Sequence, residues 1–346
     1  MLEAHQKIID AIIRKAEKVC PDSLALIGLY GSAATGDMHE KSDLDLLILI
    51  QDDRGRQLAD GFILTDTGIG YDMYCTTWEM LEADAECGHA HLAKLLDSRL
   101  LFVKDPEAVQ RLERLRQKAA DLLASEERFT KARAALDNAK KIYADCYLTE
   151  SLSQIRTGAG GVIWYLLDAV MLRHGRYFRK GSKRTFEELD ALQLSFDMQE
   201  LVLNVIRADT GDEIRNALTD LLKAVQACIP DRSEKEAPSR DNLAGTYEEI
   251  FSNWRNKMKE AADRKDLYSS FMNMVSFQSM LCDIAESVAV EEQEIMDGFD
   301  PYCLEKNPEA FDAALDRYLQ EYRKLGMQPK RYTDADAFAA AYSEAE

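Results

Sequence analysis

The sequence predicts an α+β fold in which a short sheet flanked by helices is followed by an all-helical region. Between residues 24 and 103, apolar runs of strand length are separated by turn residues, as in a small sheet. From about residue 107 onward, apolar residues recur at helical spacing, and 109–148 contains neither Gly nor Pro. The chain has 346 residues, of which 46% are apolar, so two or three domains with buried cores are expected.

The first expected element is an amphipathic helix over 3–19, which Pro21 ends. Gly68 and Gly70 supply the turn of a hairpin between two β-rich runs. Short helices should follow that hairpin, and Asp105-Pro106 should begin a longer one. The expected strands are 24–30, 44–50, 62–65, 71–76 and 99–103, and the short helices are 78–87 and 91–97.

Helical patterns make up the rest of the chain. Three glycines fall inside the pattern at 156–174, and a Gly within a helix costs about 1 kcal/mol relative to Ala, so close packing against a neighbouring helix is expected there. The polar stretch 229–240, with two prolines, is the clearest linker. Further helices are expected over 197–229 (two helices), 243–262, 266–292, 308–325 and 333–344.

The stretch at 30–50 carries the strongest functional signal. Gly31 and Ser32 follow one apolar run, and Asp43 and Asp45 open the next. Residues two apart in a strand point to the same face, so both carboxylates should project together. Two adjacent like charges are costly unless a cation lies between them, and Mg²⁺ prefers carboxylate oxygens. The Gly-Ser turn lies where a helix would begin, so its N–H groups and hydroxyl can hold phosphate oxygens.

This combination resembles the signature of the DNA polymerase β-like nucleotidyltransferase superfamily. The resemblance lies in the Gly-Ser pair, ten intervening residues that include Gly36, and the Ser-Asp-Leu-Asp of 42–45. The stretch is most similar to the small bacterial branch of aminoglycoside nucleotidyltransferases and minimal nucleotidyltransferases. The resemblance implies a nucleotidyltransferase domain with a short mixed sheet at 1–125, a helical domain completing the cleft at 126–230 and a helical C-terminal extension at 241–346.

The family needs a third carboxylate on a neighbouring strand, and Asp72 is the expected residue. Asp is unfavourable inside a strand of aromatic and branched residues, so its presence between Tyr71 and Met73 needs a reason. The structural alternative is a hydrogen-bonded or edge-exposed Asp. Asp66 competes for the same role, but it lies near the turn, where Asp is common.

The reaction implied by the resemblance is transfer of AMP from ATP to an acceptor hydroxyl. Asp43, Asp45 and Asp72 are then the catalytic and metal-binding residues, holding two Mg²⁺ ions with the nucleotide bound. Gly31 and Ser32 are expected to bind the triphosphate. If Asp72 is not a metal ligand, it could instead accept the proton of the hydroxyl.

A basic residue often follows the Gly-Ser pair in relatives, but Ala33, Ala34 and Thr35 stand here. The segment 175–189 contains five basic residues and is similar to a segment in the helical domain of small-molecule nucleotidyltransferases. We therefore expect Lys183, together with Lys180 or Arg184, to reach the triphosphate. The alternative is a solvated loop before a helix that starts at Thr185 and is capped by a capping box to Glu188.

Composition restricts the partners. The net charge of −19 argues against extended nucleic-acid contacts and mildly favours a cationic acceptor. The seven cysteines are scattered without a Cys-x-x-Cys pair, so neither zinc nor a disulfide framework is indicated. The N-terminus does not resemble a signal peptide and no apolar run reaches about 20 residues, which predicts a cytoplasmic protein without membrane spans. His89 and His91 lack helical metal-pair spacing, and surface or packing roles are expected for them.

Two functions remain open at this level. The first is an enzyme that adenylylates a hydroxyl of a small molecule, with an aminoglycoside-like compound as the candidate acceptor. The second is a protein-directed nucleotidyltransferase of a toxin–antitoxin or regulatory system. More than 200 residues follow the expected catalytic domain, which favours the first, because minimal antitoxin domains are short. A binding protein without turnover is disfavoured because the carboxylates are intact. A homodimer is left open.

Overall fold

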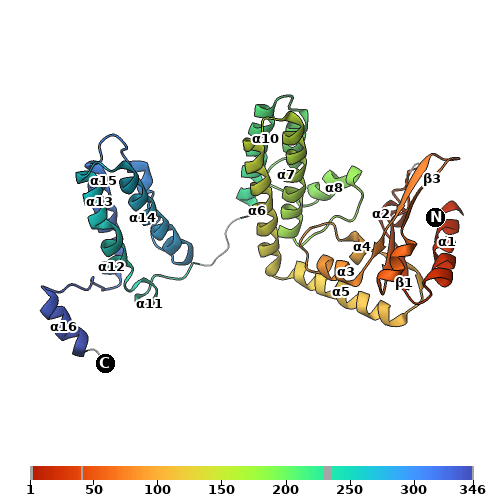
Figure 1. Ribbon diagram of the computed structural model, residues 1–346, viewed down its shortest axis with the longest axis horizontal. Helices are drawn as coiled ribbons and strands as arrows, with labels where there is room; N and C mark the ends of the chain where they lie inside the picture. Colours follow the sequence, from red (N-terminus) through yellow and green to blue (C-terminus); the bar gives the residue numbers. More distant parts are fainter. Residues whose placement is uncertain (1–2, 40–41, 230–234, 345–346) are drawn as a thin grey trace. The chain divides into compact units, whose positions relative to one another are not determined.

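The computed structural model describes residues 3–39, 42–229 and 235–344, and the chain divides into two compact units, 1–230 and 231–346. The first unit contains the sheet and the helices through α10, and the second is helical (Figure 1). The predicted α+β class with a helical C-terminal region is confirmed. Residues 230–234 of the expected linker lie outside the described residues.

A four-stranded mixed sheet forms the centre of the first unit. Its strand order is β5-β2-β1-β6. β1 pairs antiparallel with β2 and β6, whereas β2 pairs parallel with β5. β1 and β2 are buried throughout, which is why their sequences are continuous apolar runs. The strands are β1 (Leu24–Leu29), β2 (Leu46–Ile50), β5 (Cys75–Thr76) and β6 (Arg99–Val103).

A separate hairpin joins β3 (Asp60–Leu64) and β4 (Ile69–Met73). The prediction of one strand over 71–76 is wrong, because the backbone changes partner at Tyr74. β4 pairs with β3, whereas β5 pairs with β2. The predicted N-terminal helix is confirmed as α1 (Glu3–Val19), which buries His5, Ile9, Ile12 and Ala16.

Short helices and the long α5 surround the sheet. Asp105 caps α5 through a side-chain bond to the Glu107 N–H, and Pro106 occupies the first turn, as the Asp-Pro signal predicted. The predicted 91–97 helix is only one turn long in the structure. These elements are α2 (Gly31–Thr35), the 3₁₀ turn η1 (Asp53–Leu58), α3 (Trp78–Ala85), α4 (Ala93–Leu96) and α5 (Pro106–Ala124).

The remaining helices of the first unit include α6 (Glu127–Leu148) and α7 (Leu152–Arg173), which pack along each other (Figure 1). A Cβ on Gly158 would lie 2.6 Å from Cys146 Sγ, and one on Gly161 would lie 3.2 Å from Ile142 Cδ1 of α6. The expected close packing is therefore present at these two glycines. The other elements are the 3₁₀ turn η2 (Ser182–Arg184), α8 (Thr185–Asp190), α9 (Met198–Arg207) and α10 (Gly211–Cys228).

Helix α7 is long and apolar enough to cross a membrane by length and composition, and it is the one such helix among the described residues. Half of its most apolar window is buried within the fold. A core helix of a globular domain meets the same criteria, and the packing of α7 against α6 and α10 is of that kind.

The second unit packs its helices around aromatic and methionine side chains, among them Met274, Phe277, Phe311 and Tyr322. Helix α14 ends at Ser287, earlier than predicted, because Val288 forms a bridge with Glu236. The helices are α11 (Arg240–Leu243), α12 (Thr246–Ile250), the π-helical η3 (Phe251–Arg255), α13 (Asn256–Asp263), α14 (Leu267–Ser287), the 3₁₀ turn η4 (Ile295–Gly298), α15 (Lys306–Lys324) and α16 (Ala335–Glu344).

Candidate active site

Asp43 and Asp45 immediately precede β2. Asp43 is exposed and Asp45 is half-buried, whereas Leu44 and Leu46 are buried. This alternation places the two carboxylates on the same side of the chain. The strand begins two residues later than predicted, so both carboxylates belong to the approach to β2 and not to its paired part.

The Asp45 side chain lies against the Gly-Ser turn. Gly31 has a φ of 66°, and a Cβ on this residue would lie 1.9 Å from Asp45 Oδ2, so only glycine fits. The Ser32 N–H donates a hydrogen bond to the Asp45 carboxylate, and the Tyr30 N–H donates to the Asp45 carbonyl at 3.1 Å. The turn and the strand entrance are therefore held together at Asp45.

The electrostatics of this pair favour a cation. Burial raises the pKa of Asp45, and the neighbouring Asp43 raises it further, against the lowering effect of the Ser32 bond. The same charges act on Tyr30. Burial raises the pKa of its hydroxyl, and the 2.8 Å hydrogen bond to the Tyr74 hydroxyl adds to the shift. A positive charge between the two carboxylates would relieve this repulsion.

Asp72 does not join the two carboxylates in a cluster. It lies exposed on β4, where it pairs with Gly61 of β3. Among the described residues, no group of three or more His, Cys, Asp or Glu side chains is placed to hold a metal ion. The role of Asp72 as the third carboxylate stays a prediction, and its strand lies near the pair, since Asp43 acts on the adjacent Tyr71.

Asp66, the competitor for this role, lies in the hairpin turn. It lines a groove of about 610 Å³ between α1 and the hairpin, together with Lys7, Phe62 and Met73. The groove lining includes neither Asp43 nor Asp45. Asp66 and Asp43 both raise the pKa of the buried Tyr71 hydroxyl, after the larger effect of burial, so both lie in its vicinity.

The basic segment, 175–189, reaches the loop that follows the Gly-Ser turn. Lys183 Nζ donates to the Asp37 carbonyl at 2.6 Å, and Arg184 forms an ion pair with the Asp37 carboxylate. Desolvation raises the pKa of Asp37, but hydrogen bonds from Thr35 and Arg184 outweigh it, so the net shift is downward. The structure therefore brings Lys183 close to the turn containing Gly31 and Ser32.

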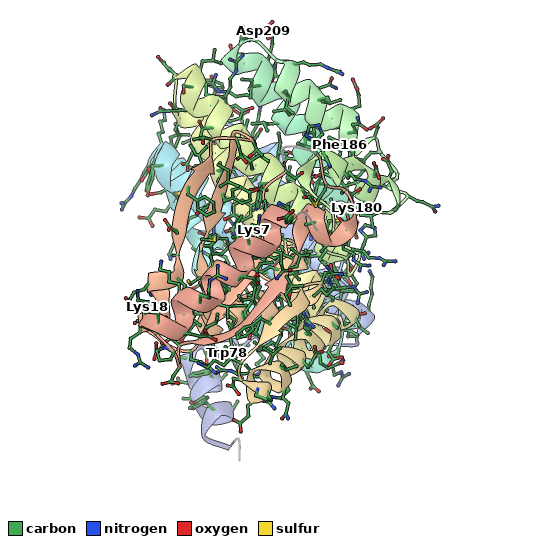
Figure 2. The ribbon with its side chains drawn as sticks, turned by 90° about the vertical axis from the view of Figure 1, so that its right-hand side faces the viewer. Lys7, Lys18, Trp78, Lys180, Phe186 and Asp209 are labelled. Carbon is green, nitrogen blue, oxygen red and sulfur yellow. The ribbon has the colours of Figure 1, made fainter. Side chains whose placement is uncertain are left out.

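The predicted capping box at Thr185 is wrong. Thr185 is the first residue of α8, and the preceding Arg184 forms no side-chain cap. The Glu188 carboxylate instead accepts hydrogen bonds from the backbone N–H groups of Arg179 and Lys180, at 3.0 and 3.1 Å. Glu188 thus folds the basic segment onto α8. Lys180 and Phe186, on either side of η2, are labelled in Figure 2.

Two further anchors tie this segment to the sheet side of the unit. The Phe178 N–H donates to the Ala90 carbonyl at 2.8 Å, and both Tyr177 and Arg179 bond to the Asp97 carboxylate. Sequence reasoning missed Asp37 and Asp97. The only local signal was that Asp37 follows Gly36, whose φ of 80° ends α2.

Comparison with known families agrees with this geometry. Residues 12–142 match the model of the nucleotidyltransferase domain family. This part of the chain is therefore similar to a nucleotidyltransferase domain. The matched region includes β1, the Gly-Ser turn, Asp43, Asp45 and β2, and it supports the superfamily that the motif indicated, a transferase with nucleotidyl-transfer chemistry. The branch within the superfamily stays a prediction.

A comparison with curated proteins found no match. Among solved structures, a nucleotidyltransferase-like protein from Exiguobacterium sibiricum 255-15 is similar over 80% of this chain and 92% of its own, at 12% identity and a TM-score of 0.36.

Proposed function

We propose that the chain is a metal-dependent nucleotidyltransferase that transfers AMP from ATP to a hydroxyl of a small-molecule acceptor. The contact of Asp45 with Gly31 carries this proposal. It places a carboxylate pair directly beside a Gly-Ser turn, which is the juxtaposition that a metal-bound triphosphate requires.

The residues fit Mg²⁺ without a third protein carboxylate. Mg²⁺ keeps several waters and is commonly bound through one or two carboxylates plus substrate phosphates. Asp43 and Asp45 supply two hard oxygen donors whose mutual repulsion a cation would relieve. When bound, the metal neutralises the triphosphate and lowers the pKa of the acceptor hydroxyl. We propose two ions with nucleotide present, with Asp72 as either a ligand or the proton acceptor.

In the reaction, the acceptor oxygen forms a bond to the α-phosphorus, the bond to the bridging oxygen breaks, and pyrophosphate leaves. Ser32 and the backbone of the turn orient the triphosphate in this scheme. Lys183 adds positive charge from the other side, which Ala33 and Ala34 cannot supply. Such positioning and charge neutralisation account for most of the catalysis in phosphoryl transfer.

We propose an aminoglycoside-like acceptor because an acidic protein concentrates cationic molecules near its clefts. The same net charge disfavours nucleic acid as the acceptor. A protein acceptor is the alternative, and it is separated by the experiment below. The proposal includes a cytoplasmic location without membrane association and leaves homodimer formation to be measured.

The test is transfer of label from ATP labelled at the α-phosphate, in the presence of Mg²⁺. One arm contains a panel of aminoglycosides and other amino- and hydroxyl-rich molecules, and the other contains a cell extract. The Asp43→Asn/Asp45→Asn double variant is the control. Label on a small molecule that disappears with the variant supports the proposal. Label only on protein supports the alternative, and no label in either arm contradicts both.

A further inference from the structure

Three aromatic rings from distant parts of the first unit stack together. The His91 ring stacks on Trp164 of α7, with centroids 4.0 Å apart and planes 22° apart. Phe178 of the basic segment stacks on the same imidazole at 5.1 Å and 26°. Trp164 keeps 52% of its surface exposed, so this ring stack presents a large indole face to solvent.

A buried carboxylate holds this stack in place. Asp168, one helical turn beyond Trp164, is fully buried. Its Oδ1 accepts the Ala90 N–H at 2.8 Å and lies 3.6 Å from His91 Nε2. Its other oxygen has no hydrogen-bond partner among the described residues. Burying a carboxylate with so few partners is costly, and such groups concentrate at functional sites.

The imidazole itself is uncharged at neutral pH. Burial lowers the pKa of His91 to about 4, with a smaller contribution from His89. The backbone N–H of His91 donates to His89 Nδ1 at 3.2 Å, and His89 Nε2 in turn lies 3.3 Å from the Asp84 carboxylate, which also binds Lys94. A neutral imidazole that packs against two aromatic rings is a suitable support for a further stacked ring.

The surface beside Trp164 is open. Gly160 lies one turn before Trp164 on α7, and a Cβ there would meet nothing within 4 Å. Gly158 and Gly161 are explained by their packing on α6, but Gly160 is not. The helix therefore offers room for a ligand ring next to the indole.

The stack is connected to the candidate active site through the basic segment. Phe178 is bonded to Ala90, and five residues later Lys183 is bonded to the Asp37 carbonyl. Five extended residues span at most roughly 18 Å. A second connection runs from Tyr30 to Tyr74 through their hydroxyls, and the Tyr74 ring has Lys94 Nζ 5.8 Å from its centroid. These contacts link the ring stack and the Gly-Ser turn through the same segments of the first unit.

We propose that Trp164, supported by His91, Phe178 and Asp168, is the stacking platform for a ring of one of the two substrates. The shared chemistry is a ring with a flat face, which either the base of the nucleotide or a sugar ring of the acceptor can provide. The proposal rests on the proposed function, since it names where that reaction's substrates are held. Stacking on an exposed aromatic side chain typically changes affinity about tenfold.

Tryptophan fluorescence tests this directly, because the chain contains three tryptophans and Trp164 is the exposed one. The protein is titrated with an α,β-methylene analogue of ATP in Mg²⁺ and, separately, with kanamycin as an amino-sugar probe. We expect one of the two to change the emission. The change should persist in Trp78→Phe and disappear in Trp164→Phe, whose phenyl ring still stacks.

Affinities measured by calorimetry complete the test. Trp164→Ala should weaken binding of the responding ligand about tenfold, whereas Trp164→Phe should stay within about threefold of the wild type. Tyr268→Ala, which removes an exposed ring in the second unit, is the matched control and should change nothing. A response to the ATP analogue assigns the platform to the base, and a response to kanamycin assigns it to the acceptor.

Unchanged emission with both ligands, or equal affinities in wild type and Trp164→Ala, overturns the platform. These results are distinguishable from failure of the proposed function. If the protein transfers no label but shows the Trp164 response, the platform is supported and the proposed reaction is contradicted. If it transfers label without that response, the reaction is supported and the platform is contradicted.

Discussion

The two compact units differ in whether their buried polar atoms have hydrogen-bond partners. In the first, side-chain polar atoms without a hydrogen-bond partner among the described residues belong to His5, Asp37, Thr76 and Asp168. In the second, Asn307 bonds to Ser270 and to the Asp300 carbonyl. Buried polar groups are normally satisfied, and exceptions mark strain or function.

Two buried tyrosine hydroxyls of the second unit are also hydrogen-bonded. The Tyr322 hydroxyl donates to the Leu243 carbonyl at 2.6 Å and accepts the Tyr247 N–H at 2.9 Å. The Tyr318 hydroxyl pairs with Thr246 at 2.6 Å. The first unit thus keeps buried polar atoms without partners, whereas these polar side chains of the second unit are paired. We expect the proposed reaction to depend on the first unit, and this can be tested unit by unit.

The largest effect is expected for Asp45→Asn. Loss of the charge that we propose to bind the metal should reduce label transfer about a thousandfold. Its folded-state pKa is raised, so the ionised form opposes folding, and stability from this group falls as pH rises through that pKa. The variant should therefore melt at the same or a higher temperature than the wild type at pH 7. A large drop in melting temperature with lost activity would assign Asp45 a structural role instead.

Gly31→Ala should be the next most harmful change. Its Cβ would overlap the Asp45 carboxylate, and displacement of that group should reduce transfer about a hundredfold. Gly36→Ala is the matched control, because Gly36 also has a positive φ but a Cβ there meets nothing within 4 Å. The control should cost only about 1 kcal/mol of stability. Equal activity of the two variants would contradict the assigned contact.

Asp168→Asn should change how stability depends on pH. Burial raises the pKa of Asp168 to about 6, so its ionisation opposes folding increasingly between about pH 4 and pH 6. The low pKa of His91 acts in the opposite direction over this range, so the comparison must be made between variant and wild type. The variant should gain up to about 3 kcal/mol on the wild type across this window, by urea unfolding. A pH-independent difference would refute this.

Tyr322→Phe probes the second unit. The change leaves the Leu243 carbonyl and the Tyr247 N–H without their buried partner, and it should cost about 2 kcal/mol. The lower free energy of unfolding should be measured by denaturant titration, in the unfolding transition of the second unit. The KM for ATP should stay unchanged. A raised KM would show that the second unit contributes to nucleotide binding.

The smallest effect is expected for Lys183→Ala, which should raise the KM for ATP about tenfold through loss of one charge-assisted contact. Lys180→Ala is the control, because Lys180 is engaged by Glu187 at 3.6 Å. The control should stay within about twofold. If both variants behave alike, Lys183 has no special access to the triphosphate.

Much of the sheet and the carboxylate pair could be predicted from local patterns. β1 and β2 are continuous apolar runs, α1 has a regular stripe, and the alternation from Asp43 to Leu46 requires only the geometry of an extended chain. These features depend on residues that are close together in the sequence, so local sequence patterns predict them.

The rest depends on partners far away in the chain. At Tyr74 the chain changes its pairing partner from β3 to β2, and both partners lie elsewhere in the sequence. Glu188 was expected to cap its own helix but binds the backbone of Arg179 and Lys180. Asp168 lies 78 residues from Ala90, and no periodicity reveals their contact. Such tertiary choices override local propensity.

The bond from Lys183 to the Asp37 carbonyl joins residues 146 positions apart. On the ribosome, chains grow by roughly 5–20 residues per second, so roughly 7–30 s separate the synthesis of these two residues. Throughout that interval the nascent chain contains Asp43 and Asp45 but not yet Lys183. The contact can therefore form only after α1 to α7 have been synthesised, and until then the proposed nucleotide site lacks Lys183.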